Sequence, residues 1–304
     1  MKVLIVGSGA VGCALGGSLI KSGQDVTFLA RGENLKVLQT RGLTFDWPSE
    51  SWRYEKVRAI DSSAKGERFD ILLFCVKGYD WQGAVPTVAA FPSEFVITFQ
   101  NGVSVHRELR EKIGNRVFAG AIYVVADRTE PGHIVSRSTA RVVIDGRAEI
   151  RESMKQLSDA LTNPNLNSQL SDDMESDLWR KYLFLCSFSA VNTLTEKTAG
   201  PILGHPATKN LLAEYMKEIV HVANASGCHL SQKDIETVFE NSSRYPANTT
   251  SSLFADYKRR QNTEVELLQG DLVRMADRYK IDVPVARTIY ALLKVKTATT
   301  DEHR

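Results

Sequence analysis

This sequence has few cysteines and histidines, and its net charge is small. Its 304 residues include four cysteines and six histidines, and the formal net charge is +2. The cysteines (Cys13, Cys75, Cys186 and Cys228) lie far apart and form no C-x-x-C pair, so we expect no disulfide framework and no bound metal. Cys13, Cys75 and Cys186 lie in apolar stretches, and we expect them to be reduced residues of the core. The small net charge gives no reason to expect nucleic acid or a membrane as a partner.

Long hydrophobic runs are also missing. No apolar stretch is long enough to cross a bilayer, and the first apolar run breaks at glycines instead of continuing as a signal peptide. We therefore expect a cytoplasmic protein. Hydrophobic residues make up 43% of the chain and charged residues 24%, as in ordinary globular proteins. The length is sufficient for two domains with a sizeable core.

The most informative stretch is at the N-terminus. Residues 3–6 form a short apolar run that is typical of a strand buried on both faces of a parallel sheet. The next residues are Gly7, Ser8, Gly9, Ala10, Val11 and Gly12, with glycines at G-x-G-x-x-G spacing. The first glycine allows a tight turn, the second lets a pyrophosphate approach the backbone, and the third lets a helix pack on the strand. The strand before and the helical pattern after favour a dinucleotide site over a glycine-rich structural turn.

A second strand, over residues 25–31, ends in Arg31. An NAD enzyme places an acidic residue at the end of this strand to bind the ribose 2′-hydroxyl, and no acid stands there. An arginine suits the 2′-phosphate of NADP instead. We therefore predict NADP(H) as the cofactor; an ordinary surface arginine is the alternative.

Two further strand ends carry polar residues. The apolar runs 70–77 and 95–102 predict buried strands with Lys77 and Asn101 at their carboxyl ends, where open α/β sheets bind ligands. On pattern alone, a ligand contact and a turn cap are equally good interpretations. Strand-like runs at 134–135 and 141–144 follow a Pro131-Gly132 turn, and we expect both to extend the same sheet as antiparallel strands. His133, just after this turn, is interpreted as a loop residue.

From about residue 171 the strand pattern stops and helical periodicity begins. Helices are predicted over residues 172–195, 206–226, 231–240, 251–260, 263–280 and 284–297. We predict an α/β fold, with an N-terminal Rossmann-type dinucleotide-binding domain (1–170) followed by an all-helical C-terminal domain (171–304). A cleft between two such domains is the usual place for a substrate.

Eight short motifs follow one another along nearly the whole chain. They are G-x-G-A-x-G at 7–12, an arginine at 31, V-K at 76–77, Q-N-G at 100–102, P-G at 131–132, W-x-K at 179–181, S-S-x-x-x-D at 251–256 and T-E-[IV]-[DE]-x-x-x-G at 263–270. Each alone fits ordinary helix, strand or turn. Together they resemble the ketopantoate reductase (2-dehydropantoate 2-reductase) family.

The resemblance implies roles for five residues. In this family the lysine that matches Lys181 is the proton donor, and the glutamate that matches Glu264 lies near that lysine and the cofactor. The asparagine matching Asn101 contacts both cofactor and substrate, the serine matching Ser252 binds substrate, and the residue matching Lys77 lies at the cofactor site. This agrees with the chemistry. Hydride transfer to the ketone carbon of a 2-oxo acid leaves negative charge on the carbonyl oxygen, which an ammonium can stabilise and protonate.

The sequence departs from the family pattern on the helix after Lys181. The family often has asparagines four and eight residues on, where this chain has Leu185 and Ser189. Ser189 is kept as a predicted substrate contact. Asn192 lies roughly 16 Å along the helix, too far to replace both asparagines. Ketopantoate, the substrate in pantothenate biosynthesis, is the first choice, and another branched or more apolar 2-oxo acid is the alternative.

Other interpretations stay open. An NADP-binding regulator without turnover would keep the glycine loop, but Lys181 and Glu264 argue against it. A related dehydrogenase, for example of the opine or 3-hydroxyacyl type, is a further alternative. The 3-hydroxyacyl type would need a catalytic histidine on a strand-end loop, and no such motif stands out. The sequence does not decide the oligomeric state, and a homodimer is one option.

Overall fold

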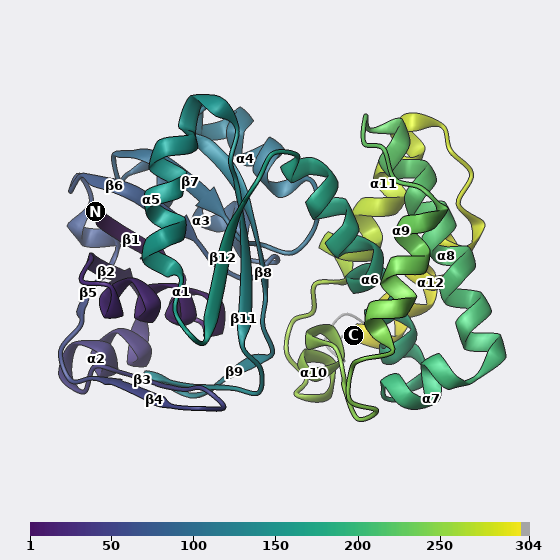
Figure 1. Ribbon diagram of the computed structural model, residues 1–304, viewed down its shortest axis with the longest axis horizontal. Helices are drawn as coiled ribbons and strands as arrows, with labels where there is room; N and C mark the ends of the chain where they lie inside the picture. The colour runs from purple at the N-terminus through teal and green to yellow at the C-terminus, as the bar shows by residue number, and fades with distance from the viewer. Residues whose placement is uncertain (299–304) are drawn as a thin grey trace. The chain divides into compact units, whose positions relative to one another are not determined.

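The chain folds into two compact units, which a computed structural model describes for residues 1–298. The first unit comprises Met1–Gln100 and Ser104–Met174, and the second comprises Asn101–Val103 and the chain from Glu175 onward. The first is an α/β unit around a largely parallel sheet, and the described part of the second is built from helices (Figure 1). The predicted fold class, a Rossmann-like domain followed by a helical domain, is confirmed.

An eight-stranded sheet forms the centre of the first unit, with the strand order β12-β11-β8-β7-β6-β1-β2-β5. The bounds are β1 (Lys2–Val6), β2 (Asp25–Leu29), β5 (Arg58–Ile60), β6 (Phe69–Phe74), β7 (Ser93–Thr98), β8 (Val117–Tyr123), β11 (Ala140–Asp145) and β12 (Leu166–Ser171). Neighbouring strands are parallel except β8 and β11, which are antiparallel. Val3 to Val6 of β1 are buried, as their unbroken apolar run predicts.

The strand order reverses at β1. Val6 at the end of β1 is paired with Leu29 of β2 on one side and Phe74 of β6 on the other, so these three strands end together. In open parallel sheets, ligands bind in the crevice outside such strand ends. The fold therefore gathers the loops that follow β1, β2 and β6 at one edge of the sheet.

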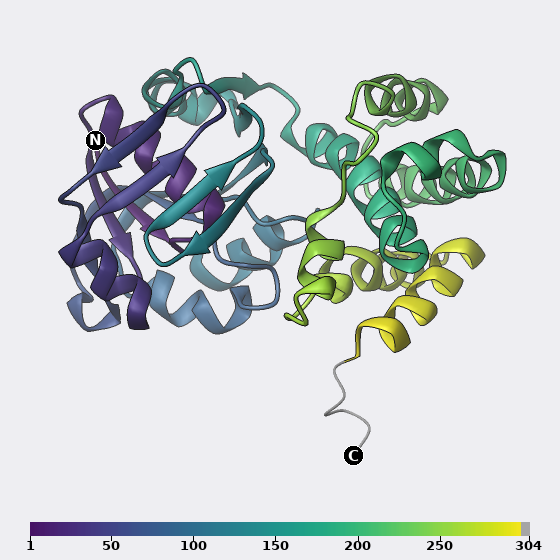
Figure 2. The same ribbon diagram turned by 90° about the horizontal axis from the view of Figure 1, so that it is seen from below.

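Helices cover both faces of this sheet. They are α1 (Ala10–Lys21), α2 (Gly32–Thr40), α3 (Trp81–Ala89), α4 (Val105–Ile113) and α5 (Arg151–Leu161). α1 packs beside α5, and α3 packs beside α4 (Figures 1 and 2). The wide apolar area of β1, β6 and β7 is in this way removed from water on both sides.

A second, four-stranded sheet lies beyond α1, with the order β4-β3-β10-β9. It contains β3 (Leu43–Asp46), β4 (Ser51–Tyr54), β9 (Ala126–Glu130) and β10 (His133–Ser136). The prediction that residues 134–135 extend the main sheet is therefore wrong; only 141–144, in β11, does so. The tight turn at Pro131-Gly132 folds β10 back on β9, and the other edge of β10 pairs in parallel with β3.

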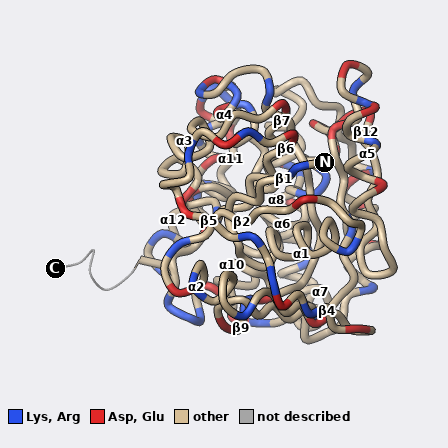
Figure 3. Tube along the Cα trace, turned by 90° about the vertical axis from the view of Figure 1, so that its left-hand side faces the viewer, with Lys and Arg blue, Asp and Glu red and all other residues tan. Residues whose placement is uncertain are grey.

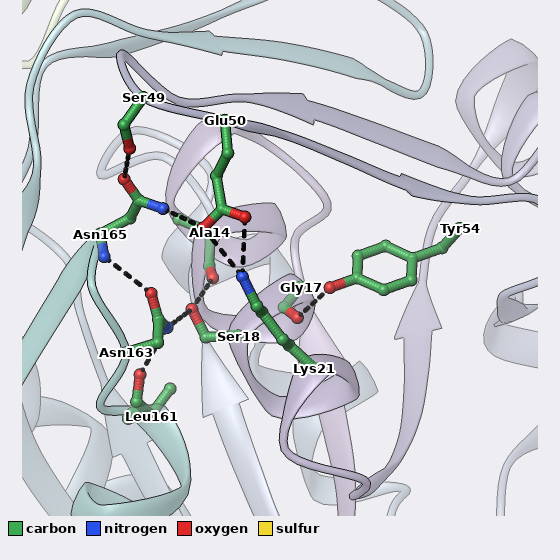
Figure 4. A network of polar contacts seen from close by, with 10 residues as sticks. All are labelled: Ala14, Gly17, Ser18, Lys21, Ser49, Glu50, Tyr54, Leu161, Asn163 and Asn165. Carbon is green, nitrogen blue, oxygen red and sulfur yellow. Dashed lines mark hydrogen bonds and ion pairs between the residues drawn. The ribbon is translucent and has the colours of Figure 1, made fainter.

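Hydrogen bonds and an ion pair tie α1 to this second sheet (Figure 4). Lys21 Nζ lies 2.8 Å from a carboxylate oxygen of Glu50, and the Tyr54 hydroxyl donates to the carbonyl of Gly17 at 2.8 Å. The buried amide of Asn165 donates to Glu50 at 2.6 Å, which brings the start of β12 into the same network. α1 is thus held from the side that faces away from the main sheet.

The second unit consists of helices around α8 (Pro206–Ala225) (Figure 2). α8 packs against α7 (Ala199–Gly204), α9 (Gln232–Ser242), α11 (Asp271–Tyr279) and α12 (Pro284–Thr297). The remaining helices are α6 (Met174–Thr195) and α10 (Ser252–Lys258).

The single helix predicted over residues 263–280 is wrong at its start. A π-helical turn, Glu266–Gly270, precedes α11. The wider turn lets the Leu268 carbonyl accept from the Tyr182 hydroxyl, and it turns the buried Gln269 amide to the carbonyl of Cys186 at 2.9 Å. Such turns cost hydrogen-bond geometry and occur often near functional sites.

Charged residues of both signs are interspersed along the chain (Figure 3). Within residues 1–298, no helix has the length and apolar character needed to cross a membrane, and no group of three or more His, Cys, Asp and Glu residues is arranged to hold a metal ion. The four cysteines are free thiols. Cys13 and Cys186 are buried core residues as predicted, whereas Cys75 is only half-buried.

Candidate active site

The loop between β1 and α1 is shaped by two of its glycines. Gly7 has φ +101°, and a Cβ there would lie 2.7 Å from the backbone nitrogen of Val76. A Cβ on Gly12 would lie 2.0 Å from the carbonyl oxygen of Gly7. Neither position accepts a larger residue without moving backbone. The loop is therefore clamped between the end of β6 and the first turn of α1.

Gly9 has a different surrounding. A Cβ on Gly9 would meet no atom within 4 Å, so packing inside the protein does not require glycine there. Gly9 is the N-cap of α1, and no side chain caps the helix. The amide groups of the first turn, from Ala10 onward, are thus available to an anion, which the helix dipole also favours. An open backbone beside uncapped amides fits the pyrophosphate of a dinucleotide.

Arg31 and Lys77 lie after the two strands that flank β1. Arg31 is the N-cap of α2, its side chain is 92% exposed, and its guanidinium lies 3.6 Å from the carboxylate of Asp80. Lys77 is exposed, and its carbonyl accepts from the backbone N–H of Asp80. Two positively charged side chains thus follow the ends of β2 and β6, the strands on either side of β1. This distribution suits a ligand with several phosphate groups.

Lys181 is held on α6 by large buried neighbours. Trp179 and Tyr182 are both buried, and their rings meet edge to face with centroids 5.4 Å apart. The hydroxyl of Tyr182 is fixed to the π-helical turn by its hydrogen bond to Leu268. Lys181 lies on the half-buried side of the same helix turn. Its backbone position is therefore set by packing that does not involve the ammonium.

Asn101 hydrogen-bonds to both Lys181 and Glu264. Lys181 Nζ donates to Asn101 Oδ1 at 3.1 Å, and Asn101 Nδ2 donates to Glu264 Oε2 at 2.9 Å. Gly102 has φ +99°, and a Cβ there would lie 3.2 Å from the Leu267 side chain, so the chain passes close over the π-helical turn. The structure brings three predicted site residues together from three distant segments of the chain.

The electrostatics of this cluster act in opposite directions. Burial lowers the pKa of Lys181 from 10.5 to about 8, and the negative charge of Glu264 opposes this effect. Glu264 is itself buried. The ammonium stays largely charged at neutral pH, but it releases its proton far more readily than a surface lysine does. A group of this kind can hold a developing negative charge and also act as an acid.

Ser252 and its neighbour have different positions. Ser252 is exposed in the first turn of α10, whereas Ser251 is buried and caps that helix by accepting from the Phe254 N–H at 3.2 Å. The hydroxyl of Ser251 donates to Asn192 Oδ1 at 2.8 Å. Asn192, at the far end of α6, therefore anchors the start of α10 and with it the backbone of Ser252.

Ser189 is fully buried in the helical unit. Its hydroxyl donates to the carbonyl of Cys186 at 3.3 Å and accepts from Gln269 at 3.4 Å. These bonds engage the side chain within the protein, and a fully buried hydroxyl offers a ligand no surface. Ser189 is for this reason left out of the site proposed below.

Leu185, one helix turn after Lys181, is half-buried. Next to it in the chain, Phe184 stacks on Phe188 with ring centroids 5.0 Å apart and on Tyr245 with centroids 5.3 Å apart. The half-buried residues that follow Lys181 on this stretch of α6 are therefore apolar.

Sequence reasoning missed two polar residues that hold the site in place. Asn34 of α2 hydrogen-bonds to Ser8 in the glycine loop, and Gln269 fixes the π-helical turn to α6. Both act across long distances in the chain. An asparagine just beyond a predicted strand and a glutamine in an apolar helical stretch carry no local signal of such contacts.

A Rossmann-like unit with a glycine loop at its strand ends is typical of oxidoreductases that bind a dinucleotide. The family model of ketopantoate reductase PanE/ApbA matches residues 3–148, and the model of the ketopantoate reductase PanE/ApbA C terminal matches residues 173–297. The chain belongs to the ketopantoate reductase PanE/ApbA family, as the motifs predicted.

Three proteins are similar to this chain over nearly its whole length. The chain is 28% identical over 303 residues to the uncharacterized oxidoreductase YkpB of Bacillus subtilis, covering 98% of this chain and 99% of the relative. A crystal structure of a PanE/ApbA family ketopantoate reductase from Ralstonia eutropha is 28% identical, with a TM-score of 0.88 and 98% of each chain covered. D-mandelate dehydrogenase, solved with NADH and anilino(oxo)acetate, has the same TM-score of 0.88 and coverage of 98% of each chain, but only 19% identity, and it shows a shared fold alone.

The lowered pKa of Lys181 predicts that this residue reduces stability at neutral pH. Because the pKa is about 8 in the folded chain and 10.5 in its ordinary surroundings, the unfolded chain binds more protons between these values, and stability rises with pH there. We expect Lys181→Met to raise the free energy of unfolding at pH 7 by on the order of 1–3 kcal/mol. Thermal and urea unfolding measure this difference.

The difference between wild type and Lys181→Met should shrink as the pH rises from 8 to 10, because the wild-type lysine then becomes neutral. Lys217→Met is the matched control, since Lys217 lies on the exposed face of α8. A variant that is no more stable than wild type at pH 7 contradicts the assigned cost of burying this charge.

Proposed function

We propose that the protein reduces a 2-oxo acid with NADPH, and that its first candidate substrate is 2-dehydropantoate (ketopantoate). The product would be pantoate, an intermediate of pantothenate and coenzyme A biosynthesis. The observation that carries the proposal is the Lys181–Asn101–Glu264 cluster, with its lysine pKa of about 8. Membership of the ketopantoate reductase PanE/ApbA family supports the reaction class.

Each residue of the cluster receives one task. A bound nicotinamide supplies a hydride to the ketone carbon. Lys181 stabilises the negative charge that develops on the carbonyl oxygen and donates the proton to it. Asn101 accepts a hydrogen bond from Lys181 and so fixes the direction of the ammonium. Glu264 accepts from the amide nitrogen of Asn101, which keeps the amide oxygen turned toward Lys181.

The first unit supplies the cofactor site in this proposal. The Gly7–Gly12 loop and the uncapped start of α1 hold the pyrophosphate, and Lys77 contributes a positive charge. Arg31 binds the 2′-phosphate, which is the reason to prefer NADPH over NADH. Ser252, exposed at the start of α10, is assigned to the substrate.

A second candidate substrate class is favoured by the apolar side chains beyond Lys181. Leu185 is half-buried one turn away, and Phe184 lies in the middle of a stack of three rings, between Phe188 and the exposed Tyr245. An apolar surface holds a branched or aromatic side chain of a 2-oxo acid better than it holds a hydroxyl, which would lose its hydrogen bonds to water. A homodimer and a cytoplasmic location stay predictions.

Replacement of Lys181 tests the reaction. Lys181→Ala removes the charge and the proton, so we expect kcat to fall by about 10²–10⁴-fold, with the Kd for NADPH little changed. Oxidation of NADPH at 340 nm with a panel of 2-oxo acids measures kcat, and a fluorescence titration measures the Kd.

The pH dependence adds a second test of the same group. Wild-type kcat should fall as the pH rises through about 8, where Lys181 loses its proton. Glu264→Gln removes a charge that favours the ammonium, so the fall should move to lower pH, while Glu236→Gln, on an exposed face of α9, should leave it in place. If Lys181→Ala turns over within a few-fold of wild type, the proposed mechanism is wrong. A wild-type protein that binds NADPH but turns over no 2-oxo acid would favour an NADP-binding regulator without turnover.

Arg31→Ala tests the choice of cofactor. The substitution removes a charge-assisted contact with the 2′-phosphate that contributes about 1.5–3 kcal/mol, and NADH lacks this phosphate. We expect the Kd for NADPH to rise by at least tenfold and the Kd for NADH to stay within twofold. Equal changes for the two cofactors would remove the basis for the NADP assignment.

Leu185→Asn tests the substrate. If Leu185 faces the substrate's side chain, an amide there should raise kcat/KM for ketopantoate relative to 2-oxo acids with apolar side chains, by about tenfold. Leu185→Met keeps the apolar surface and serves as the control. The same ratio of kcat/KM values in all three proteins would mean that this side chain does not contact the substrate.

A further inference from the structure

Asn34 connects two loops that the proposed function does not relate to each other. Its amide nitrogen lies 2.6 Å from Ser8 Oγ and 3.3 Å from the Ser8 carbonyl, and its amide oxygen accepts from the backbone N–H of Gly132 at 3.0 Å. We propose that Asn34 is a positioning residue for the dinucleotide loop, and that it transmits the rigidity of the Pro131-Gly132 turn to that loop. The inference rests on the proposed cofactor site.

On the side of the glycine loop, Asn34 holds Ser8, the residue that directly precedes Gly9. Gly7 and Gly12 are locked by close backbone contacts, whereas Gly9 lies in open space. Ser8 stands between Gly7 and Gly9, is buried, and is held by Asn34 through both its hydroxyl and its carbonyl. The direction of the peptide groups that would face a pyrophosphate is thereby set before any ligand arrives.

On the other side, Asn34 is held by a turn that itself cannot shift easily. Gly132 has φ +71°, and a Cβ there would lie 2.7 Å from the Val37 side chain of α2. The carbonyl of Gly132 accepts from the backbone N–H of Thr44 in β3 at 2.8 Å. The turn between β9 and β10 is therefore fixed by contacts with α2 and with β3. This gives the Pro131-Gly132 motif a task that neither the hairpin nor the reaction explains.

Positioning by Asn34 differs from the task given to Arg31. Asn34 acts on the loop at the pyrophosphate, which NADPH and NADH share, while Arg31 acts on the 2′-phosphate, which only NADPH has. A loop ordered in advance lowers the entropy lost on binding. Loss of Asn34 should thus weaken both cofactors equally and leave their ratio unchanged.

The test compares Asn34→Ala with a matched control, Tyr54→Phe. Tyr54 also ties the second sheet to α1, but its hydroxyl bonds to the carbonyl of Gly17, which lies beyond the Gly7–Gly12 loop in the chain (Figure 4). We expect Asn34→Ala to raise the Kd of NADPH and of NADH by about tenfold each, the worth of one hydrogen bond. Tyr54→Phe should change either Kd by less than twofold. At saturating NADPH, kcat should be unchanged in both variants, because neither residue belongs to the Lys181 cluster.

Hydrogen exchange of the ligand-free proteins gives a readout that a purely structural role would not move. The amides of residues 8–12 should exchange faster in Asn34→Ala than in Tyr54→Phe at equal melting temperature. Alanine suits the first turn of the largely exposed α2, so we expect the fold to survive. If Asn34→Ala is nevertheless unstable, Ser8→Ala breaks the same 2.6 Å contact from the loop side and should speed exchange in the same amides.

Three outcomes are distinct. Equal loss of NADPH and NADH binding with faster exchange of the loop supports the proposal. Binding and exchange in Asn34→Ala equal to those of Tyr54→Phe overturn it. Wild-type protein that binds neither cofactor overturns the proposed cofactor site itself, whatever Asn34 does to the loop.

Discussion

A lysine ammonium that is partly removed from water is the constraint on which the candidate site depends. Desolvation favours the neutral amine, and a neutral amine could not attract a developing oxyanion. The structure balances this cost with the negative charge of Glu264, and the amide of Asn101 hydrogen-bonds to both groups. The outcome is a pKa of about 8, which is below that of an ordinary lysine but leaves most of the ammonium protonated at neutral pH.

The rest of the architecture holds these groups in place without using them for packing. Trp179 and Tyr182 fix the helix that carries Lys181, and Gly102 lets Asn101 come close to the π-helical turn. In the α/β unit, Gly7 and Gly12 likewise fix the backbone of the loop between β1 and α1. In both units, the residues assigned to ligands project from backbone that is ordered by contacts of other residues, which is how a site is organised before its ligand binds.

What the sequence could predict was local, or was carried by the family resemblance. The apolar run of β1 and the glycine spacing after it indicate a strand, a turn and a helix within fifteen residues, and the structure contains all three. The second sheet could not be predicted, because the pairing of β10 with β3 joins segments about ninety positions apart. The π-helical turn was missed because its cause lies in Tyr182 and Cys186 on another helix, and Asn34 was missed because Ser8 and Gly132 are remote in the chain.

The short segment Asn101–Val103 belongs to the helical unit although the chain on both sides of it belongs to the α/β unit. The polypeptide therefore passes between the units three times, and no single cut separates them. A fragment ending near residue 174 would retain Asn101 and Gly102 but lose Glu264 and Leu267, while the remaining fragment would keep Lys181 without its amide partner. The two halves are in this sense not interchangeable modules, and a recombination that joined either half to a foreign partner would inherit an incomplete cluster.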